Sequence, residues 1–193
     1  MRGLLIAFEG LDQSGKQTQA ELLRDRLTAR GRAVRLLSFP DYGTSIGEEI
    51  GRALRGERPY GPEVMQLLYV ANRYERKQEI ADAKAAGTIL VCDRYLASSV
   101  AYGEAQGLDP SWLLDIQKQL PQPDVTILLD IPPDESARRK RAGRDKYERD
   151  LAMLARVRDS YLRQAVGGWV QLDAARDRDI VAADVFAAVE GRV

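Results

Sequence analysis

The stretch "IAFEGLDQSGKQTQ", residues 6–19, runs from an apolar strand-like segment through a glycine-bracketed loop into a helical pattern. It contains the complete pattern G-x-x-x-x-G-K, from Gly10 to Lys16. Where a strand ends and a helix begins, successive backbone N–H groups converge on a small concavity, and the helix dipole adds about half a positive charge. Glycines allow the backbone to approach phosphate oxygens, and Lys16 would place an ammonium beside them. An incidental glycine-rich turn is the alternative, but the complete pattern in this context predicts a site for nucleotide phosphates.

The predicted phosphate-binding loop, which would hold ATP, consists of Gly10, Leu11, Asp12, Gln13, Ser14, Gly15, Lys16, Gln17 and Thr18. The position after Lys16 usually carries a hydroxyl that helps to hold Mg²⁺. Here it is Gln17, and Thr18 comes one residue late. Because Mg²⁺ keeps several waters and relies on substrate phosphates, the departure leaves open which side chain touches the metal. Phosphate binding itself is unaffected.

The composition is that of a soluble globular chain. It has 193 residues, of which 45% are hydrophobic and 30% charged, with 29 basic and 29 acidic side chains. Nothing in this balance favours nucleic acid or a membrane as a partner. The absence of histidine excludes a serine-hydrolase triad and a histidine zinc site. We therefore expect one domain over residues 1–193, with no nucleic-acid or membrane partner.

Two further features suggest a cytoplasmic protein. The single cysteine, Cys92, lies among apolar residues, which predicts a buried, inert thiol that suits a reducing compartment. No apolar run approaches the ~18 residues of a membrane span, and the N-terminus lacks a signal-peptide pattern.

Apolar runs alternate with helical patterns along the chain. The predicted strands are residues 4–9, 33–39, 88–93, 125–130 and 169–174. Runs that are apolar throughout fit strands covered by helices on both faces. The pattern predicts an α/β fold of the P-loop NTPase type, a five-stranded parallel sheet of doubly wound architecture with helices on both faces.

Three helices are predicted with particular boundaries. The helix after the loop presents Ala20, Leu23 and Leu27 on one face and ends at Gly31. A long helix is expected from residues 61–62, where proline takes the first position, to Gly87. In the closing helix, residues 181, 185 and 189 are valines in register.

The segment "CDRYLASSVAYG", residues 92–103, begins where the third strand ends, and open α/β sheets bind ligands there. Asp93 could hold magnesium through water, and Arg94 could clamp a phosphate with two hydrogen bonds. Ser98 and Tyr102 lie four residues apart, on one face of the helix that follows. The alternatives are a local Asp93–Arg94 ion pair and serines that only cap the helix.

Two other segments carry aromatic and polar groups. "SFPDYG", residues 38–43, ends the second strand with aromatic residues around a proline. In the long helix, Tyr69 and Arg73 lie four residues apart, so a ring and a guanidinium could stack on a base and bind its edge. The alternative is a tyrosine at the edge of the core with a solvated arginine.

A basic segment, "ARRKRAGRDKYERD", spans residues 137–150. A solvated helix end of mixed charge is one interpretation. Opposite a phosphate-binding loop, the same cluster is a candidate lid over residues 137–150.

Taken together, these segments resemble the thymidylate kinase family, P-loop enzymes of the nucleoside monophosphate kinase type that transfer the γ-phosphate of ATP to dTMP. The resemblance is carried by "FEGLDQSGK" (8–16), "FPDYG" (39–43), "DRYLAS" (93–98) and "KYERD" (146–150), in the family's order and spacing. It extends over nearly the whole chain, and it implies an ATP- and Mg²⁺-dependent dTMP kinase that supplies dTTP synthesis. It also implies a cytoplasmic homodimer with dTMP and ATP as its small-molecule substrates.

The resemblance implies roles for individual residues. The residues that would bind dTMP are Asp12, Phe39, Pro40, Tyr42, Tyr69, Arg73, Arg94, Ser98, Ser99, Tyr102 and Tyr147. Within this set, Tyr69 would stack on thymine, Arg73 and the two serines would bind its edge, and Tyr102 would crowd the ribose 2′ position. Asp12 would contact the sugar or the metal's water shell. Ser99 stands where family members often carry a larger polar residue, so its contact with the base would pass through water.

The catalytic set implied by the resemblance is Lys16, Arg94, Asp12, Arg141 and Arg144. Some family members carry an arginine after the aspartate of the loop, whereas others supply it from the lid. Gln13 occupies that loop position here, so the arginine-rich lid of residues 137–150 is of the second kind. Asp145, Tyr147 and Glu148 would close over the acceptor or the metal, and Asp93 and Glu148 would hold Mg²⁺ through water.

Three alternatives stay open at this level. The first is a kinase for another nucleotide or deoxynucleoside, and the second is an enzyme that has degenerated at Gln17. The third is a non-catalytic switch of the GTPase kind, although the Asn-Lys-x-Asp motif that reads guanine is absent.

Overall fold

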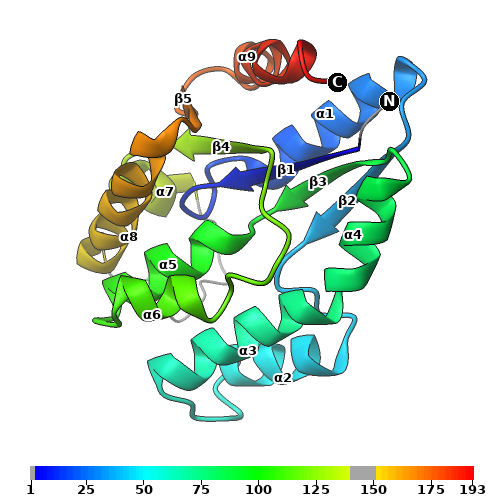
Figure 1. Ribbon diagram of the computed structural model, residues 1–193. Coiled ribbons are helices and arrows are strands. Elements are labelled where there is room, and N and C mark those ends of the chain that lie inside the picture. Colours follow the sequence, from blue (N-terminus) through cyan, green and yellow to red (C-terminus); the bar gives the residue numbers. More distant parts are fainter. Residues whose placement is uncertain (1–2, 140–150) are drawn as a thin grey trace.

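The computed structural model describes residues 3–139 and 151–193, which form a parallel sheet covered by helices on both faces (Figure 1). The strands are β1 (Leu4–Glu9), β2 (Val34–Ser38), β3 (Ile89–Asp93), β4 (Val125–Asp130) and β5 (Val170–Asp173). They lie in the order β2-β3-β1-β4-β5, and every neighbouring pair is parallel. The chain therefore starts in the middle of the sheet, and the carboxyl end of β1 lies between those of β3 and β4.

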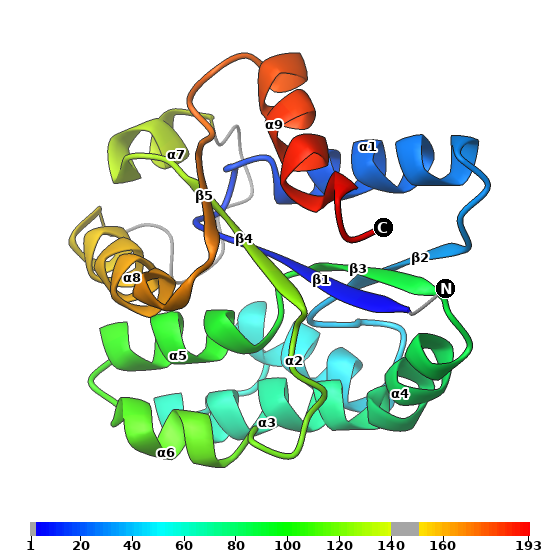
Figure 2. The same ribbon diagram turned by 45° about the horizontal axis from the view of Figure 1, so that its top comes forward.

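Helices connect the strands and lie in two layers (Figure 2). The helices are α1 (Lys16–Ala29), α2 (Ser45–Leu54), α3 (Pro62–Glu75), α4 (Lys77–Ala85), α5 (Leu96–Ala105), α6 (Pro110–Asp115), α7 (Pro133–Arg139), α8 (Leu151–Gln164) and α9 (Arg178–Glu190), with a 3₁₀ turn, η1, at Ala165–Gly167. Helices α1 and α9 cover one face, while α4, α5 and α8 lie on the other. Helices α2 and α3 pack together at one end of the second layer.

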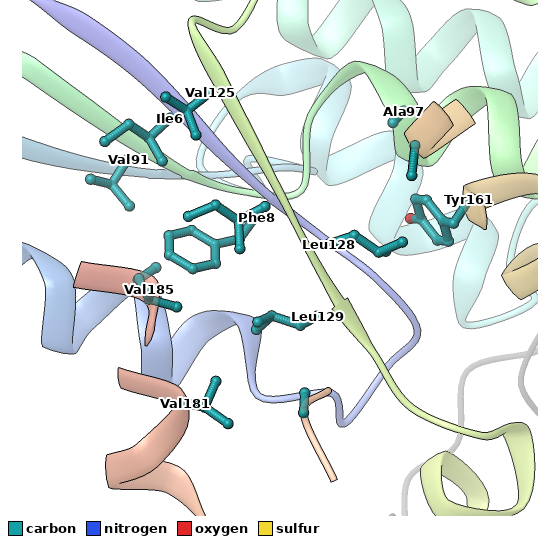
Figure 3. Packing of buried hydrophobic residues seen from close by; sticks show 14 of the residues in the cluster. Ile6, Phe8, Val91, Ala97, Val125, Leu128, Leu129, Tyr161, Val181 and Val185 are labelled. Carbon is teal, nitrogen blue, oxygen red and sulfur yellow. The ribbon is translucent and has the colours of Figure 1, made fainter. Parts of the chain in front are cut away.

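All six residues of β1 are buried, because side chains on alternate faces each meet a helical layer. Ile6 and Phe8 pack with residues of α1 and α9, including Val185 (Figure 3). On the opposite face, Leu5 and Ala7 pack against α4. Burial on both faces explains why the strand reads as an unbroken apolar run instead of an alternating one.

The predictions of strands and of the first helix are confirmed to within one residue at each end. Helix α1 begins at Lys16, ends at Ala29 and buries Ala20, Leu23 and Leu27. Gly31 follows in the left-handed region with φ 76°, and its N–H donates to the Thr28 carbonyl. Glycine ends the helix there because a side chain at that φ would be strained.

The prediction of one long helix up to Gly87 is wrong. Helix α3 ends at Glu75, and α4 begins at Lys77, with Arg76 between them at φ −98° and ψ 0°. The break directs the Arg76 guanidinium to Asp41, whose Oδ2 accepts from Nε at 2.8 Å and from Nη2 at 2.6 Å. Hydrophobic periodicity could not predict this contact, because Asp41 and Arg76 are 35 residues apart in the chain.

The prediction that Cys92 is buried is confirmed. Cys92 is fully buried on β3, and burial raises the pKa of its thiol, with Glu9 adding to that effect. Within residues 3–139 and 151–193, no helix is long and apolar enough to cross a membrane.

Candidate active site

The loop between β1 and α1 turns where its two glycines allow it. Gly10 and Gly15 have φ values of 139° and 90°, which side chains rarely adopt. A Cβ at Gly10 would lie 2.4 Å from the Leu129 carbonyl oxygen, so the loop can pass β4 only with glycine there. The loop delivers its backbone to the start of α1, which is the geometry that suits a phosphate group.

Lys16 folds back over the loop from the first position of α1. Its side chain is buried, and Nζ donates to the Leu11 carbonyl at 2.7 Å and lies 3.5 Å from Ser14 Oγ. The exposed Gln17 instead donates from Nε2 to Glu21 Oε1 at 2.9 Å, along the surface of α1. The Lys16 ammonium therefore lies within the loop, whereas the Gln17 side chain lies on the surface of α1.

Arg94 joins the loop to α5. It follows β3 directly at φ 63°, and its side chain is only 16% exposed. Nη1 lies within hydrogen-bond distance of the Gly10 carbonyl and of Ser98 Oγ, both at 3.3 Å. Nη2 donates to Tyr102 Oη at 3.2 Å and pairs with the Asp12 carboxylate. One guanidinium thus touches the phosphate loop and the helix that lines the cavity beside it.

The interpretation of Arg94 as one half of a local pair with Asp93 is wrong, because its carboxylate partner is Asp12. Burial alone would lower the pKa of Arg94, but Tyr102 and Asp12 raise it well above its usual value. The side chain stays cationic at every pH at which the fold persists. A fixed positive charge therefore lies between the phosphate loop and the cavity beside it.

A cavity of about 260 Å³ opens beside Arg94 at the carboxyl ends of β2 and β3. Ten of the predicted dTMP-binding residues line it: Asp12, Phe39, Pro40, Tyr42, Tyr69, Arg73, Arg94, Ser98, Ser99 and Tyr102. They come from the loop after β1, the turns after β2 and β3, and helices α3 and α5. Segments that are far apart in the sequence therefore line one cavity.

Arg73 is not a solvated side chain. It is 3% exposed, and Nη1 donates to Ser99 Oγ at 2.7 Å. Its guanidinium carbon lies 5.9 Å from the centre of the Phe39 ring. Burial lowers the pKa of Arg73, while the charge of Glu9 opposes that shift. The buried Arg73 thus presents a cation to the cavity wall.

The interpretation of the two serines as helix caps is also wrong, because the cap of α5 is Tyr95 and both serines lie inside the helix. Ser98 Oγ donates to Glu9 Oε2 at 2.6 Å and lies 2.8 Å from Tyr161 Oη. Glu9 also accepts from the Tyr95 N–H at 2.9 Å. Ser98 thus fixes α5 against the end of β1 beside Arg94, whereas Ser99 accepts from Arg73 on α3.

Several buried polar atoms at the cavity have no hydrogen-bond partner in the described part of the chain. They are Gln66 Oε1, Arg73 Nε, Asp93 Oδ1 and Gln106 Oε1. Leaving a buried polar group unpaired costs about 1–3 kcal/mol, and such groups in native proteins often mark functional sites. Their concentration at one cavity suits a polar ligand.

Comparisons with known proteins agree with this geometry. The sequence profile of the family described as thymidylate kinase matches residues 8–185. The chain belongs to the thymidylate kinase family. Thymidylate kinase of Schizosaccharomyces pombe is 38% identical over 162 residues, covering 84% of this chain and 77% of that protein. Thymidylate kinase of Caenorhabditis elegans is 36% identical, covering 96% of this chain and 89% of that protein.

A solved structure gives the same assignment. Thymidylate kinase from Candida albicans superposes with a TM-score of 0.88 at 32% identity, covering 98% of this chain and 92% of that chain. The predicted α/β nucleotide kinase fold is confirmed by this likeness and by the parallel sheet.

The sequence did not predict some of the residues at this site. Gln66 and Gln106 line the cavity, as does Leu54. Tyr161, on α8, places its hydroxyl 3.4 Å from Arg94 Nη1. Glu9 could have been found, because a carboxylate that ends a fully apolar strand needs buried partners. Tyr161 carried no such signal, since its contacts lie more than 60 residues away in the chain.

The basic segment is described only at its start. Arg138 pairs with Glu135, whereas Arg139 also donates to the carbonyls of Gln13 at 3.3 Å and Ala174 at 3.1 Å. The predicted lid residues Arg141, Arg144, Asp145, Tyr147 and Glu148 lie outside the described residues. Ser136, directly before this segment, donates from Oγ to the Asp12 carbonyl of the phosphate loop at 2.8 Å.

Proposed function

We propose that this protein transfers the γ-phosphoryl group of ATP to dTMP, forming dTDP for dTTP synthesis. One observation carries the assignment beyond family membership: the ten described residues expected at dTMP line a single cavity, and Arg94 links it to the phosphate loop. Residues 1–193 act as one catalytic domain in this proposal, with 137–150 as its lid, where Arg141 and Arg144 supply the lid arginine.

On the donor side, the loop from Gly10 to Thr18 binds the ATP phosphates. Its backbone N–H groups and the α1 dipole attract negative charge, and Lys16 adds an ammonium. Nζ already lies inside the loop, where it exchanges the Leu11 carbonyl for phosphate oxygens when ATP binds.

On the acceptor side, Tyr69 stacks on thymine while Arg73 and Ser99 bind its edge. Phe39, with Pro40 and Tyr42, walls the pocket, and Tyr102 crowds the ribose 2′ position. Their shared cavity supports these roles. The hydrogen bond between Arg73 and Ser99 orients the guanidinium toward the base.

At the junction, Arg94 holds the monophosphate of dTMP, with Asp12 and Ser98 fixing its guanidinium. An oxygen of this phosphate attacks the γ-phosphorus, a new P–O bond forms, and the bond to the β-phosphate bridging oxygen breaks to release ADP. A phosphate monoester is largely dianionic at neutral pH, so the acceptor needs no general base. The absence of histidine is consistent with this route.

Mg²⁺ is part of the proposal. Asp93 ends β3 at the cavity, and its Oδ1 is buried without a hydrogen-bond partner in the described chain, which suits a carboxylate that binds the water shell of a cation. Among residues 3–139 and 151–193, no group of three or more acidic or sulfur side chains gathers at a metal-binding distance. Asp93 and Glu148 would hold the ion through water. When bound, Mg²⁺ neutralises charge on the β- and γ-phosphates.

We further propose that the protein is a cytoplasmic homodimer. Helices α3 and α6 are neighbours, since Tyr74 Oη donates to the Ile116 carbonyl at 3.3 Å. They expose Val64, Leu67 and Leu114, apolar side chains that a second copy would cover. Leu67→Glu should shift the protein from dimer to monomer in analytical ultracentrifugation, and a monomeric wild-type protein would contradict the dimer.

A coupled assay tests the function directly. ADP production is measured with Mg·ATP and each of dTMP, dUMP, dCMP, dGMP and thymidine, and we expect dTMP to give the highest kcat/KM. The Candida albicans protein is described as having broad substrate specificity, so strictness for thymine must be measured for this chain. Preference for an acceptor other than dTMP would overturn the assignment in favour of another nucleotide kinase.

A further inference from the structure

The end of α3 holds the turn of residues 39–44 in place through one fully buried side chain. Asn72 is 0% exposed. Its Oδ1 accepts from the Asp41 N–H at 2.7 Å. Its Nδ2 lies within hydrogen-bond distance of the Asp41 carbonyl at 3.1 Å, Thr44 Oγ1 at 2.8 Å and Glu75 Oε2 at 3.0 Å. The two amide hydrogens are thus shared among three acceptors, and Asn72 bonds to both the N–H and the carbonyl of Asp41.

A second contact between the helices and the turn comes from the break after α3. Arg76 donates twice to Asp41 Oδ2, and its Nη1 donates to Glu79 Oε2 at 3.0 Å. Within the turn, Asp41 Oδ1 accepts from the Gly43 N–H at 2.9 Å. The backbone and the carboxylate of the same residue are therefore both fixed from the α3–α4 junction.

The start of α2 closes the turn from its other side. A Cβ at Gly47 would lie 1.8 Å from the Asp41 carbonyl oxygen, so the helix presses directly on the turn. Thr44 Oγ1 caps α2 by accepting from the Gly47 N–H at 3.0 Å. Tyr42 packs beside Gly51, whose added Cβ would lie 3.6 Å from its ring. Both α2 and α3 therefore contact the turn.

The same turn supplies one wall of the cavity, through Phe39, Pro40 and Tyr42, while Arg73 forms another part of the lining. Asn72 and Arg73 are consecutive in α3, so one residue holds the turn and the next faces the cavity across from it. The end of α3 therefore determines the distance between the Arg73 guanidinium and the part of the wall formed by residues 39–42.

We propose that Asn72 is a positioning residue for the acceptor: with Arg76, it fixes the 39–44 turn so that the pocket matches a nucleoside monophosphate before it binds. This role rests on the function proposed above. The proposal predicts an effect on acceptor binding alone, because neither Asn72 nor Arg76 lines the cavity and neither touches the phosphate loop in the described contacts. Loss of Asn72 should loosen acceptor binding and leave ATP binding intact.

The experiment compares Asn72→Ala with a matched control, Gln117→Leu. Gln117 is also a buried amide, whose Nε2 donates to the Leu96 carbonyl at 3.1 Å, but it lies outside this cavity. We expect Asn72→Ala to raise KM for dTMP about tenfold, with kcat and KM for ATP within about twofold of wild type. Gln117→Leu should lower the melting temperature without changing KM for dTMP. Equal changes in both KM values, or the same KM rise in the control, would overturn the proposal.

Two further measurements keep the test decisive. If Asn72→Ala fails to fold, Arg76→Met replaces it, because that side chain is 35% exposed. A rise of about threefold in KM for dTMP alone supports the proposal, and an unchanged KM rejects it. Amide hydrogen exchange of ligand-free protein gives a readout that needs no activity: Asn72→Ala should speed exchange over residues 39–47 and leave 10–18 unchanged.

The wild-type assay separates this proposal from the proposed function. If the enzyme prefers a monophosphate other than dTMP, the function fails, and the same KM comparison is made with the preferred acceptor.

Discussion

The phosphate loop and the acceptor cavity are adjacent but are built in opposite ways. In the loop, Lys16 bonds to Leu11, five residues away, and the glycine conformations are local. The cavity is held by contacts between distant parts of the chain, such as Arg73 with Ser99 and Arg94 with Asp12. A local structure depends on the residues of its own motif, whereas an assembled one also depends on residues that do not line the cavity, such as Asn72. The two regions should therefore respond differently to substitution.

Lys16→Ala is expected to have the largest effect, because it removes the ammonium from the donor side without disturbing the cavity. Loss of one preorganised charged donor typically lowers kcat by about 10²–10³-fold. The melting temperature should change little, and dTMP binding measured by titration calorimetry should persist. A kcat within tenfold of wild type would show that the loop amides bind the donor phosphates without Lys16.

Arg94→Lys comes next and tests the link between the two regions. Lysine keeps the charge but cannot make the forked contacts to Gly10, Asp12 and Tyr102. We expect kcat/KM to fall about 100-fold for both dTMP and ATP, since the guanidinium touches both halves. An effect confined to one substrate would mean that Arg94 belongs to one region only.

This contrast also explains how far the sequence could predict the molecule. Strands and the loop were predictable because burial and glycine conformations leave local signals, as in residues 4–9 and Gly10–Gly15. The membership of the cavity was accessible only through the family's motifs, which name residues without stating what holds them. Asn72 and Tyr161 could not be predicted, because their roles consist of contacts with distant segments.

The helix break at Arg76 shows the same limit. Residues 62–85 have nothing in their composition that ends a helix, and Arg76 is a good helix former. At the break, the Arg76 guanidinium donates to Asp41. The structure therefore departs from the helix propensity of Arg76 at the residue that contacts Asp41, in the turn beside the acceptor cavity.

Asp41→Asn probes the assembled region through pH, with a smaller effect. Burial alone would raise the pKa of Asp41, but hydrogen bonds from Arg76 and from the Gly43 N–H leave it below the usual 3.8. A carboxyl whose pKa is lower in the folded state stabilises the fold above its unfolded pKa, and this contribution is lost as pH falls through the folded pKa. Both side chains are partly exposed, so at neutral pH we expect a deficit of about 1 kcal/mol or less.

Urea unfolding from pH 7 to pH 3 measures that deficit. The difference between wild type and Asp41→Asn should be constant near neutrality and should shrink below about pH 4. A difference that stays constant to pH 3 would mean that the Asp41 charge contributes nothing and that the backbone contacts to Asn72 alone hold the turn.

Gln17→Ser should have the smallest effect, although it restores the hydroxyl that phosphate-binding loops usually carry. Gln17 is exposed and bonded to Glu21 along α1, so its replacement removes only a surface contact of a few tenths of a kcal/mol. Because Mg²⁺ relies mainly on phosphate oxygens and water, we expect kcat to stay within about tenfold, with a similar Mg²⁺ dependence. A wild-type protein that is inactive until this substitution is made would show that the loop hydroxyl is indispensable to the metal. The phosphate loop would then be inactive because it lacks one hydroxyl oxygen, although every contact of the acceptor cavity is present.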